Sequence, residues 1–345
     1  MSSIGVPLIF EPLYVERVWG GNRLGKVFGK NLPVGKTIGE TWELCDRVDA
    51  QTKVTGGPFD GWTIRKLMET HPEALLGKEL AARKPKFFPL LIKYIDAGHD
   101  LSVQVHPDDM GALALGYNDR GKTECWVVVQ ADPGAKIQRG LKPGVTREQF
   151  EGALNAGKVE TVLHFFTPKI GDVVAIPPGM IHAIGKGMIV AEIQQNSDVT
   201  FRVFDYNRVG LDGKPRALHV QESLKSTCFD GDFGDYFQGD MKTEVRSDAI
   251  GPVLQGRYFD LWVDEVPMPC QTRIHPQTGT TLSQSPASPA APRILMFLRG
   301  EGLLNGQSIK AGQTVLLPAD VGPLELKVTH KQGLKWASSR PTPEA

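Results

Sequence analysis

The stretch KIGDVVAIPPGMIH, residues 169–182, decides the fold, because a second stretch of the chain repeats its pattern. KAGQTVLLPADVGP, residues 310–323, has the same spacing, Lys-x-Gly-x-x-Val-x-(Ile or Leu)-Pro. A short apolar run between a glycine and a proline predicts a β-strand bounded by turns. The recurrence therefore predicts one β unit that occurs twice. In this alignment His182 corresponds to Pro323, so only the first copy keeps an imidazole where the turn ends.

The rest of the chain supports a mainly β fold. Among its 345 residues, 38 glycines and 25 prolines separate many short runs rich in Val, Ile, Leu and Phe, as is typical of barrels and sandwiches. Helices are expected as insertions over residues 63–84, broken near His71 and Pro72, over 146–157, where Thr146 and Gln149 form a capping-box pattern, and over 216–226.

The predicted organisation has two units. Residues 1–240 form the first, with a helical insertion near 60–84, and residues 241–345 form the second. Residues 270–293 are poor in large apolar side chains and rich in Ser, Thr and Pro, so we expect a long exposed loop there. The last eight residues, SSRPTPEA, are expected to fray.

Composition excludes several classes of partner. Lys plus Arg equals Asp plus Glu at 39 each, so no overall basic field attracts nucleic acid or an anionic membrane. The N-terminus lacks a secretory signal pattern, and no apolar run approaches the roughly 18 residues of a membrane span. Four cysteines without paired spacing indicate reduced thiols, which predicts a cytoplasmic protein.

The stretch DLSVQVHPDDM, residues 100–110, suggests a metal site. In a strand, Ser102, Gln104 and His106 share one face. The candidate ligands of the whole chain are Gln104, His106, Glu124 and His182. This mixed nitrogen and oxygen set without a thiolate suits Zn²⁺, and also Fe²⁺, Co²⁺, Ni²⁺ or Mn²⁺. The alternative is that each residue is an ordinary structural or surface group at a strand end.

The stretch NSDVTFRVFDYNR, residues 196–208, suggests an anion site. In a regular strand Asp198, Arg202 and Arg208 share a face, where arginines suit phosphate and a carboxylate accepts from hydroxyl groups. A solvated outer face with Asp–Arg pairs is the alternative. In GETWE, residues 39–43, Glu40 beside Trp42 is either a sugar-contacting corner or part of a turn around a core tryptophan.

Taken together, these segments resemble the type I mannose-6-phosphate isomerases in their short bacterial form. The matching pieces occur in the order VWGG, GETWE, LSVQVHPDD, GKTECW, IPPGMIHAIG and NSDVTFRVFDYNR. The resemblance implies two cupin-type (jelly-roll) β-barrels, the second without a metal. It implies zinc, one ion per chain, bound by Gln104, His106, Glu124 and His182. It places in the substrate cleft Ser102, Lys122, Glu40, Asp198, Arg202 and Arg208. Arg208 stands where longer relatives have a lysine, which leaves its contact open.

The implied reaction interconverts mannose 6-phosphate and fructose 6-phosphate by proton transfer between C2 and C1 through an enediolate. A divalent cation and cationic side chains stabilise the negative charge that develops on oxygen. Lys122, Arg202 and Asp198 are the predicted catalytic residues. Lys122, Glu192, Asp198 and a metal-bound hydroxide are all candidate bases, and the sequence does not choose among them.

Two other functions compete with this prediction. One is a non-catalytic protein that binds sugar phosphates, and the other is an Fe²⁺ oxygenase using His106, His182 and Glu124. The expected partner is a small phosphosugar, with no nucleic acid and no membrane, and the expected state is a monomer or weak homo-oligomer.

Overall fold

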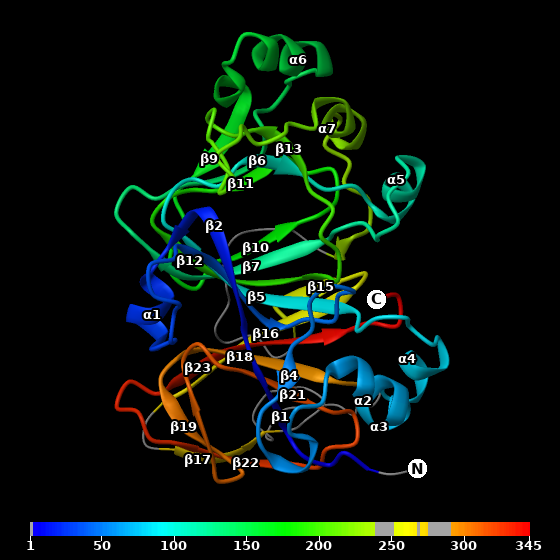
Figure 1. Cartoon of the computed structure of the whole chain (residues 1–345), viewed down its shortest axis with the longest axis vertical. Helices are drawn as coiled ribbons and strands as arrows, with labels where there is room; N and C mark the ends of the chain where they lie inside the picture. The colour runs from blue at the N-terminus through cyan, green and yellow to red at the C-terminus, as the bar shows by residue number, and fades with distance from the viewer. Residues whose placement is uncertain (1–2, 239–251, 268–269, 275–290) are drawn as a thin grey trace.

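The computed structural model describes residues 3–238, 252–267, 270–274 and 291–345. Its strands form four sheets that stack as layers, two in each half of the molecule (Figure 1). The mainly β fold is as predicted. No hydrogen-bonded ladder of the described residues joins the two sheets of a half into a closed barrel.

A six-stranded and a five-stranded sheet make up the first pair. The six-stranded sheet has the order β10 (Val173–Ile176), β7 (Glu124–Ala131), β12 (Met188–Gln195), β5 (Leu90–Ala97), β3 (Ile38–Leu44) and β2 (Leu13–Gly21). The five-stranded sheet has the order β13 (Phe201–Phe204), β6 (Val103–Val105), β11 (His182–Ile184), β8 (Ile137–Leu141) and β9 (Leu163–Phe166).

The second pair consists of an eight-stranded and a four-stranded sheet. The eight-stranded sheet has the order β14 (Phe237–Gln238), β15 (Leu254–Gly256), β16 (Phe259–Val266), β23 (Leu334–Pro341), β18 (Arg293–Arg299), β21 (Thr314–Leu317), β1 (Leu8–Glu11) and β4 (Lys53–Val54). The four-stranded sheet has the order β17 (Cys270–Ile274), β22 (Leu324–Val328), β19 (Glu301–Leu304) and β20 (Gln307–Lys310).

The two sheet pairs repeat one topology, as the sequence echo predicts. The echoed stretches supply β10 and β21, whose bounds agree under the sequence alignment. The order β10-β7-β12-β5 in the first pair matches β21-β18-β23-β16 in the second, and β6-β11-β8-β9 matches β17-β22-β19-β20. Eight consecutive strands, β5 to β12, therefore correspond one by one to β16 to β23.

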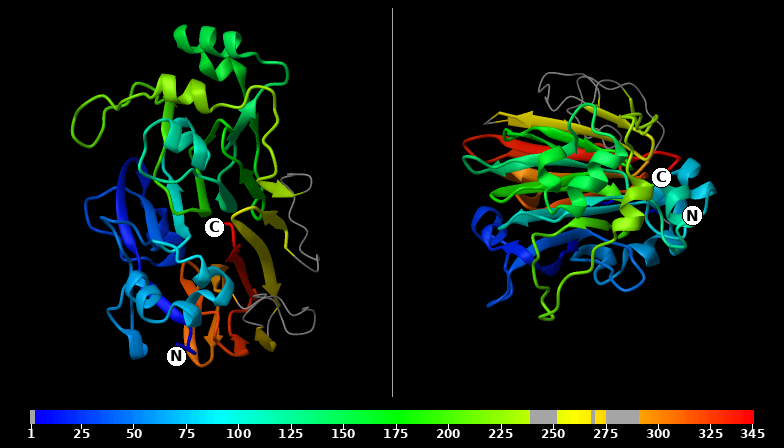
Figure 2. Two further views of the ribbon diagram at one scale, coloured as in Figure 1. Left: turned by 90° about the vertical axis from the view of Figure 1, so that its right-hand side faces the viewer. Right: turned by 90° about the horizontal axis from the view of Figure 1, so that it is seen from above.

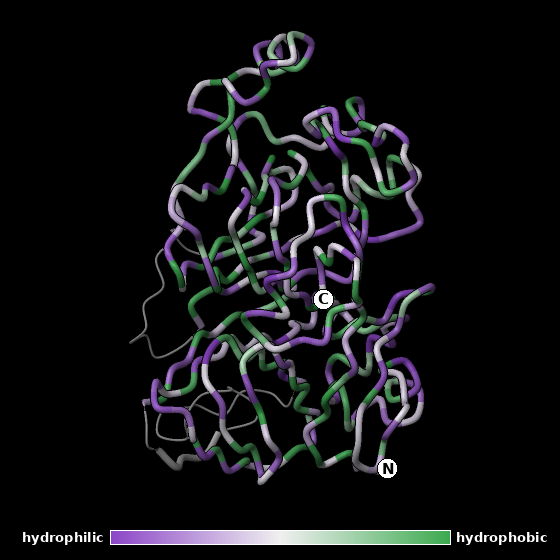
Figure 3. Tube along the Cα trace, turned by 60° about the vertical axis from the view of Figure 1, so that its left-hand side comes forward, coloured by the Kyte–Doolittle hydropathy of each residue, from purple (hydrophilic) through white to green (hydrophobic). Residues whose placement is uncertain are grey.

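Apolar side chains hold the layers together. The six-stranded and eight-stranded sheets share one buried cluster, in which Ile92 and Tyr94 of β5 pack with Ile294 and Met296 of β18. Separate clusters fill the space inside each pair and cover the outer face of the five-stranded sheet. Figure 3 shows hydrophobic segments concentrated along the layered strands and hydrophilic segments in many of the peripheral turns.

Helices occupy the periphery. α2 (Ile64–Thr70), α3 (Pro72–Leu76) and α4 (Lys78–Ala82) form the expected insertion with its break at His71. The capping box of Thr146 and Gln149 begins α6 (Arg147–Asn155), which lies at one end of the molecule (Figure 2). The other helices are α1 (Arg23–Phe28), α5 (Asp109–Ala114) and α7 (Val220–Ser226). The helices of the described residues are all too short or too polar for a membrane span.

Two local predictions are wrong in part. The loop expected over residues 270–293 begins with a strand, β17, which pairs with β22, and ends at Arg293 in β18; residues 275–290 lie outside the described part. The tail expected to fray continues β23 to Pro341, because its backbone pairs with β16 and β18 and buries Ser338 and Ser339.

The N-terminal strands contribute to the second half of the molecule. β1 pairs with β21 on one side and with β4 on the other, so both strands extend the eight-stranded sheet. The division at residues 240 and 241 stays a prediction. The pairing of β1 with β21 means that the two halves are connected by more than the linking chain.

Candidate metal centre and substrate cavity

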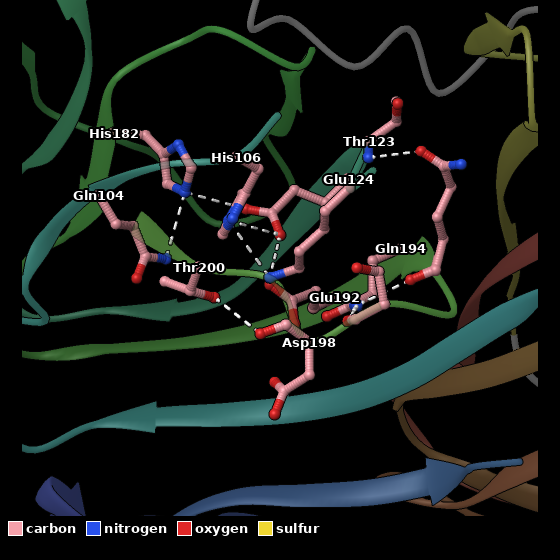
Figure 4. Close-up of polar contacts among 12 residues, drawn as sticks. Gln104, His106, Thr123, Glu124, His182, Glu192, Gln194, Asp198 and Thr200 are labelled. Carbon is pink, nitrogen blue, oxygen red and sulfur yellow. Dashed lines mark hydrogen bonds and ion pairs between the residues drawn. The ribbon is translucent and has the colours of Figure 1, made fainter. Parts of the chain in front are cut away.

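Four predicted ligands converge between the two sheets of the first pair. Gln104 lies in β6 and His106 follows it, while His182 begins β11 directly opposite Gln104 in the strand register. Glu124 begins β7 in the other sheet. Figure 4 shows these four side chains pointing toward one another. The polar face predicted for β6 thus points inward, while Val103 and Val105 pack against the outer cluster.

Hydrogen bonds orient both imidazoles. His106 Nδ1 lies 2.8 Å from the carbonyl oxygen of Val199, and His182 Nδ1 lies 2.8 Å from that of Met180. Since a carbonyl only accepts, Nδ1 carries the proton in each ring, and each Nε2 presents a lone pair. This second hydrogen bond is the arrangement that fixes histidine ligands of metals.

The Nε2 lone pairs face a buried carboxylate. His182 Nε2 lies 3.2 Å from Glu124 Oε1, and His106 Nε2 lies 3.7 Å from Glu124 Oε2. All three side chains are buried, and their candidate ligand atoms lie within 4.8 Å of one another. Two electron-pair donors that face each other in a buried space are stabilised by a cation between them, so the donor set fits a divalent metal ion.

Burial shifts the protonation of these groups in a consistent direction. Desolvation lowers the pKa of His182 to about 3 and lowers the pKa of His106 well below its ordinary value, with Lys122 adding to the effect. Desolvation also raises the pKa of Glu124 to about 7. Neutral imidazoles at neutral pH are the form that binds metals.

Backbone contacts fix the segments that carry the ligands. The amide of Lys122 donates to the Pro107 carbonyl at 3.0 Å, and the amide of Thr123 donates to Gln195 Oε1 at 2.8 Å. The amide of Gly179 donates to the His106 carbonyl at 2.9 Å. The segments that carry His106 and Glu124 are therefore tied to neighbouring parts of the chain.

A cavity of about 250 Å³ adjoins the centre. Predicted site residues that line it are Glu40, Ser102, Gln104, Lys122, Glu192, Asp198 and Arg202. Lys122 Nζ lies 2.7 Å from Glu124 Oε2 and 3.3 Å from His106 Nε2, at the metal end of the cavity. The carboxylate of Asp198 points away from the ligand cluster (Figure 4).

Arg208 is placed differently from the prediction. It is not among the residues that line the cavity, and its guanidinium pairs with Asp205 and with the carbonyl of Asp100. The regular strand that would put it beside Arg202 ends at Phe204, because Tyr206 and Asn207 both adopt a φ of 54°. The shared face of residues 198–208 is therefore interrupted.

A buried ion network borders the cavity. Lys93 Nζ lies 3.1 Å from Glu192 Oε2 and 3.7 Å from Glu40 Oε2. The indole of Trp42 donates to Glu40, and the indole of Trp126 donates to Glu192. Although burial opposes ionisation, Lys93 lowers the pKa of both Glu40 and Glu192, with Arg17 assisting at Glu40. Both carboxyl groups are therefore ionised at neutral pH.

Three cationic residues of the cavity were not predicted. They are Arg17 from β2, Lys93 from β5, and Arg216, which directly follows the isolated β-bridge between Val209 and Pro215. One feature of the sequence indicated Lys93, because it is a single lysine inside the apolar run PLLIKYIDA. Arg17 directly precedes the VWGG stretch and Arg216 lies in a polar segment, and only the fold brings them to Arg202.

Comparison with known proteins gives one family. The sequence profile described as phosphomannose isomerase type I, catalytic domain, matches residues 8–124. The putative mannose-6-phosphate isomerase YvyI of Bacillus subtilis is 31% identical over 328 residues, which cover 94% of this chain and 96% of that protein. The probable mannose-6-phosphate isomerase GmuF of the same species is 39% identical over 219 residues, covering 64% and 67% of the two chains.

Solved structures agree with this result. The crystal structure of the mannose 6-phosphate isomerase from Bacillus subtilis has a TM-score of 0.80 and 27% identity, and the match covers 96% of this chain and 99% of that one. A putative mannosephosphate isomerase from Archaeoglobus fulgidus has a TM-score of 0.73 at 23% identity, which supports the fold alone.

Proposed function

Since the chain belongs to the family of type I mannose-6-phosphate isomerases, we propose that it interconverts mannose 6-phosphate and fructose 6-phosphate in the cavity beside Glu124. The observation that carries the proposal is the convergence of His106, Glu124 and His182, buried and oriented, at one end of a cavity that is rich in cationic side chains. A metal centre next to cationic side chains suits a reaction in which negative charge develops on oxygen.

The ion that we propose is zinc, held by His106 Nε2, His182 Nε2, a Glu124 oxygen and the Gln104 amide oxygen. Gln104 Nε2 lies 3.2 Å from His182 Nε2, so the amide group has to turn by about 180° to present its oxygen to the ion. Its support is the chemistry of the donor set, two neutral imidazoles and a carboxylate without a thiolate. When bound, a divalent cation polarises the substrate oxygens and stabilises the enediolate charge.

Lys122 is the residue we propose to move the proton. Its Nζ lies beside both Glu124 and His106, so it faces the position where the reacting carbons come nearest to the metal end. Arg202 contributes positive charge from β13, and Asp198 lies in the cavity lining near it. Glu40 and Glu192 are held by Lys93 and two indoles, which suits ionised acceptors for sugar hydroxyl groups.

The sheet pairs fit the cupin prediction. We propose that β5–β12 and β16–β23 are two jelly-roll units, of which only the first binds metal. Their matched strand orders support this, and so does the replacement of His182 by Pro323. A cytoplasmic monomer or weak homo-oligomer remains our expectation for the assembly.

Incubation with fructose 6-phosphate tests the proposal. We expect mannose 6-phosphate to form, the reaction to stop in the presence of a chelator, and activity to return when a divalent metal ion is added in excess of the chelator. Tight binding of the sugar phosphate without turnover in the metal-loaded protein would instead indicate a non-catalytic binding protein. Oxygen uptake with substrate would indicate oxygenase chemistry.

A further inference from the structure

Three guanidinium groups meet at the cavity from separate parts of the chain. Arg17 comes from β2, Arg202 from β13, and Arg216 from the segment before α7. All three line the same cavity of about 250 Å³. Their charges act on one another, since Arg216 and Arg17 both lower the pKa of Arg202, after the larger effect of burial. Such repulsion is relieved when an anion binds between the groups.

Hydrogen bonds from one of its nitrogen atoms hold each guanidinium in place. Arg17 Nε donates to Glu40 at 2.8 Å, and Arg216 Nη1 donates to both oxygens of Asp205 at 3.1 and 3.0 Å. Arg202 Nη1 donates to the carbonyl of Ala217 at 2.8 Å. A guanidinium has five N–H donors in a planar fork, so this anchoring leaves further donors on each side chain.

Arg202 carries the charge that its surroundings neutralise least. Its buried Nε has no hydrogen-bond partner among the described residues, and its one anchor is a neutral carbonyl. By contrast, Arg17 pairs with Glu40 and Arg216 pairs with Asp205. A buried N–H group without a partner costs free energy unless a ligand satisfies it.

The two lysines of the cavity form ion pairs with carboxylates. Lys122 lies 2.7 Å from Glu124, and Lys93 lies 3.1 Å from Glu192. Both lysines therefore neutralise carboxylates near the metal end. Arg17 and Arg216 also pair with carboxylates, but each guanidinium keeps further N–H donors for an anion of the substrate.

We propose that Arg17, Arg202 and Arg216 together bind the phosphate of the sugar phosphate, and so orient its carbonyl end toward Lys122 and Glu124. This assignment rests on the proposed isomerase function and adds to it the direction in which the substrate lies. Arg208 acts as a positioning residue, because it shares Asp205 with Arg216.

The test compares the metal-loaded R17Q and R216Q variants with wild type, using mannose 6-phosphate and unphosphorylated mannose. We expect each variant to raise the KM for mannose 6-phosphate roughly 10- to 100-fold, the range for a lost charged hydrogen bond, and to change kcat less than about threefold. The kcat/KM for mannose should fall much less than the kcat/KM for mannose 6-phosphate, because mannose has no phosphate to lose. R216K should recover part of the loss, since it keeps the charge but not the planar fork.

R147Q is the matched control, because Arg147 is an exposed arginine of α6 that pairs with Glu151. It should behave as wild type. An unchanged KM in both R17Q and R216Q would overturn the proposal, and so would equal losses with mannose and mannose 6-phosphate, which indicate a structural effect.

If the wild-type protein does not isomerise the sugar phosphate, the proposed function fails, and calorimetric titration with inorganic phosphate then tests the arginine site by itself. Phosphate that binds to wild type and R147Q but about tenfold or more weakly to R17Q and R216Q would support the site. Equal binding to all four proteins, or binding to none, would contradict it.

Discussion

Arg293 stands in the second sheet pair at the position that Glu124 takes in the first. Ile176 of β10 pairs with Glu124, and its repeat partner Leu317 of β21 pairs with Arg293. Arg293 is fully buried, and its guanidinium lies 3.9 Å from the ring centre of Trp262. A guanidinium only donates hydrogen bonds and does not bind a cation. This position therefore supports a second unit without a metal ion.

The same strand register matches the buried ion network of the first sheet pair with uncharged residues in the second. Glu192 pairs with Lys93 across β12 and β5, and the matching residues of the second pair are Ser338 and Trp262. The repeat has thus kept its backbone pairing while the charged site of one unit became a different buried cluster in the other.

Replacing Arg293 by Met should destabilise the protein without affecting the metal centre. The change removes a buried cation from Asp264 and Trp262, and loss of one partner from a buried ionic cluster costs about 3–5 kcal/mol. Urea unfolding at pH 8, above the pKa of Asp264, measures this loss. Metal content and kcat of the folded protein should match wild type, and loss of bound metal at unchanged stability would contradict the separation of the two units.

The pH dependence of the unfolding free energy should reveal the titration of the Asp264 carboxyl group. Burial raises the pKa of Asp264 from its ordinary value of 3.8 to about 7. The protonated form is therefore favoured in the folded state, so its contribution to stability is present at pH 4 and is lost as the pH rises through 7. The D264N variant lacks this titration, so its unfolding free energy relative to wild type should increase between pH 4 and 7. A constant difference would show that Asp264 does not titrate in this range.

Replacing Lys93 by Met should leave Glu192 without its paired lysine and Glu40 with Arg17 alone. We expect a loss of about 3–5 kcal/mol in the free energy of unfolding at pH 7. Because Lys93 lowers the pKa of Glu40 and Glu192 below their ordinary 4.5, its benefit is lost as the pH falls, so the difference from wild type should be smaller at pH 4 than at pH 7. The K26M variant, which changes an exposed lysine of α1, is the control. A difference in unfolding free energy between K93M and wild type that grows as the pH falls would contradict this ion network.

Two glycine substitutions should have opposite effects. A Cβ on Gly121 would lie 2.2 Å from the backbone carbon of Asp108, so G121A forces the segment that carries Lys122 and Glu124 away from His106. Crowding of this kind costs about 1–3 kcal/mol, and we expect weaker metal binding and lower kcat as well.

In G152A nothing lies within 4 Å of the new Cβ, and Gly152 is exposed in α6. This substitution should stabilise the protein by about 0.5–1 kcal/mol with unchanged activity. Thermal unfolding and metal titration measure both variants. A G121A protein that binds metal as wild type does would contradict the described tie between the two segments.

Much of the fold was predictable because local pattern and tertiary structure agree. The apolar runs of β7 and β12 are strands, and the alternation in DLSVQVH does place Ser102 and Gln104 on one inward face. The echo of residues 169–182 in 310–323 predicted the repeated unit, because the same turns bound the same short strand in both copies.

The remaining parts depend on contacts that a single segment does not encode. Arg208 was misplaced because two left-handed residues end the strand, and neither Tyr206 nor Asn207 is a glycine that would have indicated the turn. Arg17 and Arg216 were missed because they reach Arg202 only through the stacking of separate strands and loops. Ser338 and Ser339 looked like part of a tail, and pairing on both sides of β23 makes them core.

Anomalous diffraction from crystals of the zinc-loaded protein tests the central claim most directly. We predict one strong peak in the first sheet pair, roughly 2.0–2.2 Å from His106 Nε2, His182 Nε2 and an oxygen of Glu124, with the Gln104 amide oxygen as the fourth protein ligand. We predict no peak beside Arg293. A peak that lies away from these four side chains, or the absence of any peak among them in crystals that contain zinc, would contradict the account.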